Sequence, residues 1–177
     1  SSVTDINQVL NSGSSAVTYG FATGADATVT YTANAGAVTT NIANASTTFS
    51  NIGNLTILGD NNENAGATDG TTLSTGNISA GSALSSLTIK SDLATNGAGV
   101  DNTVTTGSIA ASGLTTLSIA ANAADVSVST AADTTLAGLT ALTLSTTTDG
   151  QTVDFVDGQK LVAVNLQSLT VNASAGN

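Results

Sequence analysis

Residues 114–119 read LTTLSI, and this six-residue pattern decides the fold because it occurs five times in the chain. Each copy has an apolar first residue, Leu at the fourth position, Thr or Ser at the fifth and an apolar sixth residue. The other copies are 52–57 (IGNLTI), 84–89 (LSSLTI), 139–144 (LTALTL) and 166–171 (LQSLTV). Successive fourth-position leucines lie 25 to 32 residues apart, which indicates a degenerate structural repeat.

Each copy has the alternation of a β-strand with one buried face. Leu117 and Ile119 point to one side of an extended chain, and Ser118 points to the other. Further short strand candidates lie between the copies, such as 152–156 and 161–164, with Asp-Gly turns beside them. Three short strands in each repeat are typical of a parallel β-helix. The chain also has no Pro, which would remove donors from a continuous ladder.

We therefore predict an all-β fold, a parallel β-helix (β-solenoid) with coils of about 25–32 residues. The alternative is an antiparallel β-sandwich, which also contains many short strands of alternating polarity. Asn-Gly and Asp-Gly hairpin signals are few, and similar strands lie farther apart than the roughly 8–12 residues usual in sandwiches. Both observations favour the solenoid.

The first part of the chain is less regular, and we predict irregular N-terminal coils or a cap over 1–45. A polar start at Thr4 and Asp5, an apolar stripe and a stop at Gly13 predict a short helix; the stripe is Ile6, Val9 and Leu10. The aromatic residues also gather in this part, which predicts a larger core there. We expect 46–177 to form the solenoid repeats, in one continuous domain that is a fragment of, or a subunit in, a larger assembly.

The composition excludes several function classes. Ala, Thr, Ser and Gly make up more than half of the chain, and charged residues are only 8%. His and Cys are absent, so imidazole bases, Cys-His relays and thiolate metal sites are excluded. Lys90 and Lys160 are the only basic residues, against 12 acidic residues and a net charge of −10, so no basic stripe can bind nucleic acid.

Acidic and amide side chains form two candidate calcium sites. Residues 59–70 (GDNNENAGATDG) place Asp60, Asn62 and Asn64 at alternate positions, with Asp69 further on. Ca²⁺ takes about 6–8 oxygen ligands, which side chains on a curling loop can supply. The loop departs from an EF-hand, because Ala65 replaces the sixth-position Gly and the twelfth-position acid is missing.

The second candidate calcium site consists of Asp149, Asp154 and Asp157. The alternative for both clusters is a set of polar turns, since Asn and Asp tolerate left-handed backbone. In that interpretation Asp154 faces solvent beside Lys160 in a weak surface ion pair. Calcium is therefore the one cofactor that the sequence suggests.

The composition and the phrases LSSLTIKSD, LTTLSIAAN and LTALTLSTT resemble the solenoid regions of bacterial surface-layer proteins, especially large type I-secreted proteins of the RTX type. The resemblance covers roughly residues 45–175. It implies a subunit of an extracellular lattice or filament that binds calcium at its contacts. The Gly-Asp nonapeptide of RTX calcium rolls is missing, so calcium ligands cannot be transferred by motif. Adhesins and phage tail fibres share this style, which leaves a glycan-binding module as the alternative function.

Charge and hydropathy suggest where such a protein resides. An acidic surface with two Lys is repelled by nucleic acid and by anionic membranes, and it offers trypsin almost nothing to cut. No apolar run approaches the roughly 18–20 residues that span a bilayer. We expect an extracellular protein of the bacterial cell surface, with no membrane insertion, that associates with itself or with a surface glycan.

Two further functions are disfavoured. A glycosidase needs two acids about 5–9.5 Å apart, but the chain has no Trp to stack sugars and no Arg beside the acids, so we do not expect an enzyme. Ice binding needs a flat array of Thr hydroxyls. Clusters such as 146–148 suggest one, but Thr does not recur at one fixed place across the coils.

Overall fold

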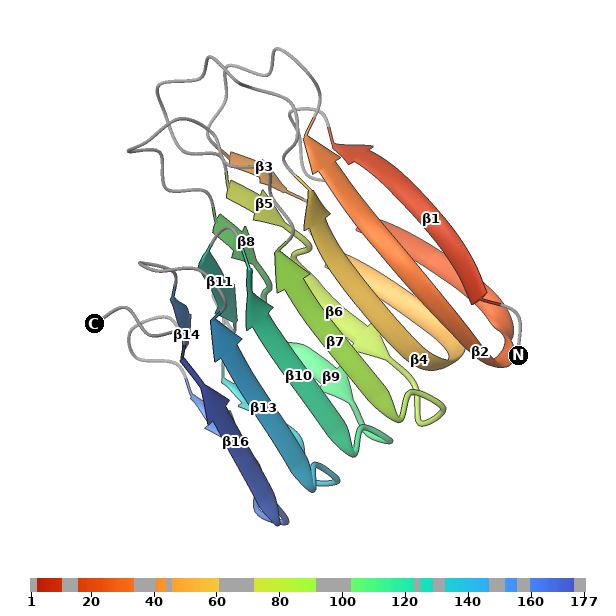
Figure 1. Ribbon diagram of the computed structural model, residues 1–177. Helices are drawn as coiled ribbons and strands as arrows, with labels where there is room; N and C mark the ends of the chain where they lie inside the picture. Colours follow the sequence, from red (N-terminus) through yellow and green to blue (C-terminus); the bar gives the residue numbers. More distant parts are fainter. Residues whose placement is uncertain are drawn as a thin grey trace.

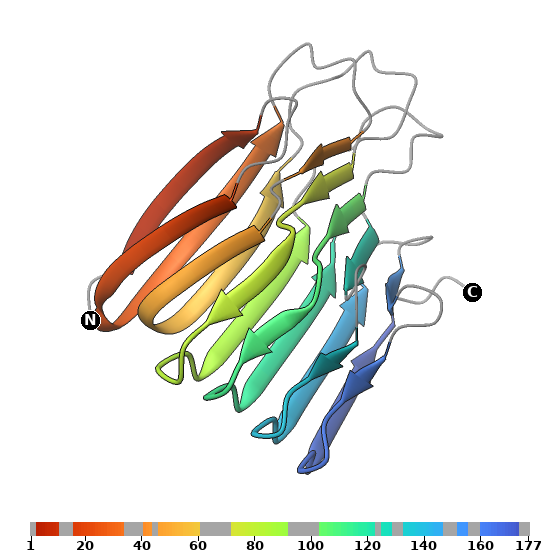
Figure 2. The same ribbon diagram turned by 180° about the vertical axis from the view of Figure 1, so that it is seen from behind.

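The structure, a computed structural model, describes residues 3–10, 16–33, 41–43, 46–60, 72–91, 103–122, 125–128, 133–146, 152–155 and 160–173. Its regular elements there are all β-strands, stacked as a solenoid (Figures 1 and 2). The strands are β1 (Val3–Leu10), β2 (Ala16–Ala33), β3 (Asn41–Ala43), β4 (Ser46–Asp60), β5 (Thr72–Ser74), β6 (Asn77–Ala80), β7 (Ser86–Ser91), β8 (Thr103–Thr105), β9 (Ile109–Ala111), β10 (Thr116–Ala121), β11 (Asp125–Val128), β12 (Thr134–Thr135), β13 (Ala141–Thr146), β14 (Val153–Phe155), β15 (Leu161–Val162) and β16 (Ser168–Asn172).

The strands form three sheets, and every recorded strand pair is parallel. The long sheet has the order β1-β2-β4-β7-β10-β13-β16, with β6 and β9 attached to it through β4. A second sheet has the order β14-β11-β8-β5-β3, and β12 pairs with β15 in a third. Successive coils add one strand each to the same stack, as the colours of Figure 1 show. This arrangement confirms the parallel β-solenoid and not the antiparallel sandwich.

The register of the long sheet aligns the five sequence repeats. Each strand pair places the fourth-position Leu of one repeat beside that of the next; the column is Leu55, Leu87, Leu117, Leu142 and Leu169. The sixth-position residues form a second column, Ile57, Ile89, Ile119, Leu144 and Val171. We call these the Leu column and the Ile column. The structural coil is therefore the sequence repeat.

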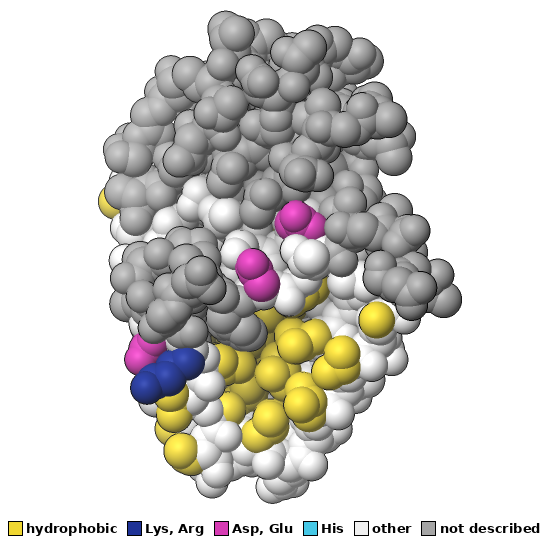
Figure 3. All heavy atoms as spheres, turned by 90° about the vertical axis from the view of Figure 1, so that its left-hand side faces the viewer, with side chains coloured by type: hydrophobic (Ala, Val, Ile, Leu, Met, Phe, Trp, Pro, Cys, Tyr) yellow, Lys and Arg dark blue, Asp and Glu magenta, His cyan; other side chains and the backbone are white. Residues whose placement is uncertain are grey.

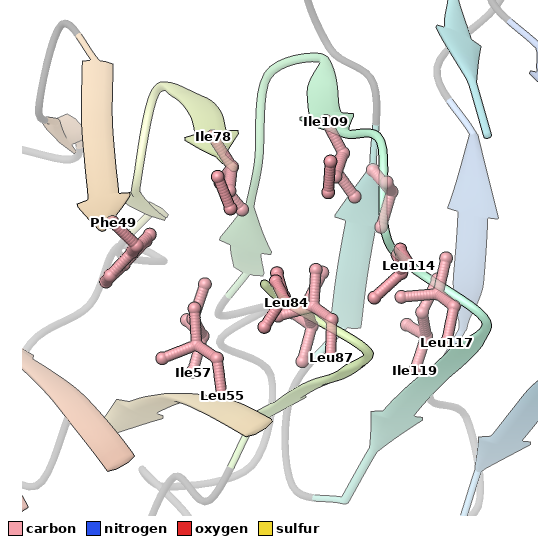
Figure 4. Packing of buried hydrophobic residues seen from close by; sticks show 14 of the residues in the cluster. Phe49, Leu55, Ile57, Ile78, Leu84, Leu87, Ile109, Leu114, Leu117 and Ile119 are labelled. Carbon is pink, nitrogen blue, oxygen red and sulfur yellow. The ribbon is translucent and has the colours of Figure 1, made fainter. Parts of the chain in front are cut away.

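The two columns form the centre of the core. Leu87, Leu117 and Ile119 are fully buried, together with the first-position residues Leu84 and Leu114. Figure 4 shows these side chains from successive coils packed in rows against Ile78 and Ile109 of the facing short strands. Full burial stabilises each such side chain by about 1.5–3 kcal/mol relative to exposure, so the repeated apolar residues stabilise every inner coil.

The short helix predicted from Thr4 to Gly13 is wrong. Val3–Leu10 is the strand β1, and all eight of its residues pair in parallel with Asp26–Ala33 of β2. The segment forms a strand because the edge of β2 offers hydrogen-bond partners to its backbone along the whole length. Capping signals stabilise a helix only weakly, and this pairing in the folded protein is the stronger effect. β-Branched residues such as Val3 and Ile6 also favour the extended form.

The strands β2 and β4 each turn a corner of the solenoid. The register between them shifts at Gly20/Ala25 and again at Ala25/Asp26. Positive φ angles at Gly24 (74°) and Asn51 (64°) produce the bend. The long sheet runs from β1 and β2 directly into β4, and a division of the chain at residues 45 and 46 stays a prediction. None of the described segments is a helix that could cross a membrane.

Candidate calcium sites and the open end of the solenoid

The predicted calcium ligands fall mostly beyond the described residues. Asn62, Asn64, Asp69, Asp149 and Asp157 lie outside them. Asp60 ends β4, and the structure describes its backbone alone. Asp154 lies in β14, where its exposed carboxylate accepts a hydrogen bond from the Ser127 hydroxyl of the preceding coil. No group of three acidic side chains gathers among the described residues. Calcium binding therefore stays a prediction for both clusters.

The described acids instead bond from coil to coil. Asp125 Oδ1 accepts a hydrogen bond from the backbone N–H of Thr152, with a donor–acceptor distance of 2.7 Å. Asp133 Oδ1 accepts one from the N–H of Lys160 at 3.0 Å, and its Oδ2 lies 3.7 Å from Lys160 Nζ. Lys160 thus pairs with Asp133. These carboxylates satisfy backbone donors where a coil changes direction.

The Ser or Thr side chains at the second position of the repeat form a ladder of hydrogen bonds between coils. The Ser85 hydroxyl donates to the carbonyl of Gly53 at 3.0 Å, and Thr115 donates to the carbonyl of Ser85 at 3.0 Å. Thr140 continues the ladder to the carbonyl of Thr115 at 3.1 Å. All four residues occupy the second repeat position, so a hydroxyl there bonds to the equivalent residue one coil earlier. Sequence reasoning missed this role, although Ser or Thr follows the first apolar residue in three of the five copies.

The outer face of the long sheet carries Thr or Ser at one fixed place. The fifth repeat positions and their partner in β2 align in a column: Thr28, Thr56, Thr88, Ser118, Thr143 and Thr170. The expectation that Thr does not recur at one place is therefore wrong, because unequal coil lengths hide the register in the sequence. The next outward column is mixed and includes Leu58 and Lys90. The outward column on the other side contains Asn54, Ser86, Thr116, Ala141 and Ser168, so further hydroxyls flank the Thr column.

The Leu and Ile columns become exposed in the last coil that the structure describes. Leu169 and Val171 of β16 are 59% and 64% exposed, although they continue the Leu and Ile columns. One coil earlier, Leu142 is 7% exposed. Val164, in the turn before β16, is 75% exposed. Figure 3 shows hydrophobic side chains gathered on this end of the molecule. We call Val164, Leu169 and Val171 the open-end patch.

The N-terminal end is filled by aromatic rings. The rings of Tyr19 and Phe49 stack with centroids 5.5 Å apart, and Phe21 lies 6.5 Å from Tyr19. The Tyr19 hydroxyl donates to Gln8 of β1, and the buried Tyr31 hydroxyl lies 3.5 Å from Thr47 Oγ1. Burial raises the pKa of both Tyr19 and Tyr31 above the ordinary value. Tyr31 and Phe49 thus belong to the core, and Tyr19 and Phe21 pack against it; whether the core is larger at this end stays a prediction.

The short strands β6 and β9 border a shallow depression of about 450 Å³. Its polar lining consists of Ser79, Ser112 and Thr135, and the remaining lining residues are alanines. Such a surface offers hydroxyls to a ligand but no carboxylate or ring. Comparisons with protein-family models, with curated proteins and with solved structures find no match to this chain.

Proposed function

We propose that this chain is a non-enzymatic structural protein of the bacterial cell surface, a β-solenoid subunit that assembles into a surface layer or an extracellular filament. The observation that carries the proposal is the in-register stacking of the five repeats, which builds a continuous parallel ladder across the described coils. The same columns that are buried in the inner coils are exposed at Leu169 and Val171. In a solenoid such side chains are covered by a further coil, by a cap or by a neighbouring subunit.

Composition supports a passive and durable role. The chain lacks His, Cys and Arg, and the described carboxylates Asp125, Asp133 and Asp154 bond between coils. Few Lys and no Arg suit a protein exposed to external proteases. The net charge of −10 opposes association of copies, and Ca²⁺ on the acidic surface would reduce that repulsion.

Negative-stain electron microscopy and sedimentation with calcium, with magnesium and with a chelator test the proposal. We expect ordered polymers or sheets, and a shift toward larger species in calcium that magnesium does not reproduce. A monodisperse monomer under all three conditions, across a wide range of protein concentration, would contradict assembly. Polymers that are equal in size with calcium and with chelator would remove calcium from the proposal and leave assembly standing.

The second candidate function is a glycan-binding module of an adhesin or a tail fibre. The hydroxyl-lined depression at Ser79, Ser112 and Thr135 is the observation that favours it. Calcium-independent binding on a glycan array, lost in a Ser79→Ala/Ser112→Ala double variant, would support this candidate. Absence of binding to every glycan would count against it.

A further inference from the structure

The third and fifth positions of the repeat form a continuous strip on the outer face of the long sheet. Both positions flank the inward fourth-position Leu, and the register aligns them from β4 to β16 without a shift. Figure 1 shows these strands side by side. We call the two columns the hydroxyl strip: the column from Thr56 to Thr170 and the flanking column from Asn54 to Ser168. Every residue of the strip except Asn54 and Ala141 is Ser or Thr.

The hydroxyls of the strip are available to bind water. The second-position hydroxyl of Thr115 bonds to the preceding coil. In contrast, the hydroxyls of Thr56, Thr88 and Thr143 have no hydrogen-bond partner among the described residues. These three side chains are half-buried between their neighbours, and branching at Cβ restricts the χ1 angle of Thr. Each coil therefore holds a hydroxyl and a methyl group at a nearly fixed place on the surface.

Charged side chains avoid the strip, although the chain is acidic. The net charge is −10, and no residue of the hydroxyl strip is charged. Asp125 and Asp154 lie in the second sheet, and Asp133 precedes the third. Asp26 borders the strip in β2, where its Oδ1 accepts a hydrogen bond from the Asn54 amide at 2.6 Å. The strip therefore suits an uncharged partner that forms hydrogen bonds.

The register gives the hydroxyls a regular spacing in two directions. Neighbouring parallel strands lie about 4.8 Å apart, and alternate residues of one strand lie about 6.6 Å apart. The first spacing is close to the shorter lattice repeat of ordinary ice. First-shell waters on regularly spaced hydroxyls are held at regularly spaced positions. Such a layer of water can continue into an ice lattice.

We propose that the hydroxyl strip is an ice-binding surface, which orders water and adsorbs to growing ice. This activity goes beyond the proposed assembly and does not depend on it, because each monomer carries the whole strip. A second copy of the chain fits the strip less well. Five strands about 4.8 Å apart, with about four residues rising about 3.3 Å each, give a footprint of roughly 300 Å². A standard protein interface buries about 800 Å² on each partner.

Thermal hysteresis, the gap between the melting and freezing temperatures of an ice crystal in the protein solution, tests the proposal. The wild type should produce a gap that grows with protein concentration. Thr88→Tyr raises a ring above the hydroxyl rows in the middle of the strip and should lose most of the gap. Tyr is favoured in strands, so the fold should be retained. The matched control Thr135→Tyr puts the same ring on the exposed strand β12 and should keep the gap.

A direct adsorption measurement keeps the proposal testable if Thr88→Tyr disturbs folding. The chain has no Cys, so Thr135→Cys accepts a single fluorescent label away from the strip. The labelled protein should be enriched in slowly grown ice. Adding Thr143→Lys should leave it in the liquid, because a long hydrated side chain then stands between the strip and the ice. Lys90, in a neighbouring outward column, indicates that the outer face accommodates a Lys side chain.

The outcomes separate the strip from other surfaces and other occupants. Absence of hysteresis, together with absence of enrichment in ice, would overturn the proposal. Equal losses in Thr88→Tyr and Thr135→Tyr would overturn the assignment to the strip. Self-association that Thr88→Tyr and Thr143→Lys abolish, with no effect of the wild type on ice, would overturn ice binding in favour of a second copy on this face.

Discussion

Truncating the same residue type in the same column should have very different costs at the centre and at the end of the solenoid. Leu117 is fully buried, and Leu169, two coils later, is 59% exposed. Buried Leu→Ala changes cost about 2–5 kcal/mol, since the loss of transfer free energy is added to that of a cavity. We expect Leu117→Ala to lie in this range.

The cost at Leu169 follows from its partial burial. About two fifths of the side chain is removed from water, and full burial of Leu is worth about 1.5–3 kcal/mol, so the lost transfer free energy is about 1 kcal/mol. Solvent reaches the site, so no empty cavity adds to this value. Leu169→Ala should therefore destabilise the monomer at least about twofold less than Leu117→Ala.

Urea unfolding of both variants and of the wild type, at a protein concentration where sedimentation shows monomers, measures the difference. The m value should stay unchanged so that midpoints report stability. Equal losses for the two variants would refute the reasoning, because they would mean that Leu169 is covered within the monomer. A loss below about 1 kcal/mol for Leu117→Ala would refute the assignment of the Leu column to the core.

Three more predictions concern the corners and the aromatic end. Thr115→Val keeps the shape of the side chain but removes the hydrogen bond from the Thr115 hydroxyl to the preceding coil, so we expect the free energy of unfolding to fall by about 1 kcal/mol. The control is Thr143→Val in the outward column of Thr and Ser residues, for which we expect a smaller change. Gly113→Ala would place a Cβ 2.0 Å from a backbone oxygen of the preceding coil, whereas the Cβ of Gly81→Ala meets no atom within 4 Å. In thermal unfolding, the free energy of unfolding should fall by about 1–3 kcal/mol for Gly113→Ala and change little for Gly81→Ala. Burial raises the pKa of Tyr31, so the phenol stays neutral in the folded protein while it ionises in the unfolded chain above about pH 10, and the folded protein should lose stability as the pH rises above that value. In Tyr31→Phe, the midpoint of alkaline unfolding measured by circular dichroism should move to higher pH. An unchanged midpoint would contradict this cause.

The part of the fold that periodicity specifies was predictable from the sequence. A strand with one buried face must alternate apolar and polar residues, as Leu117, Ser118 and Ile119 do. Five copies of that alternation predict a stack in which equivalent residues are in register. The helix over residues 4–13 failed for a different reason. Local capping signals describe an isolated segment, whereas β1 forms on the edge that β2 provides.

The candidate sites were less predictable, because they depend on which residues meet across coils. The bond between Asp125 and the N–H of Thr152 joins residues 27 positions apart, and neither residue is part of the repeat pattern. The Thr column was hidden by coils of unequal length. The hydroxyl ladder from Ser85 to Thr140 left a signal in the second repeat position, but its meaning required knowing that equivalent corners stack.

The parallel ladder also determines how such a protein would carry mechanical load. Because the strands run across the solenoid, the backbone hydrogen bonds between coils point along its axis. A pull along the axis stretches all bonds of one coil-to-coil contact at the same time, and every contact bears the same force. The tensile strength is then that of the weakest contact, so added coils lengthen the fibre without making it stronger.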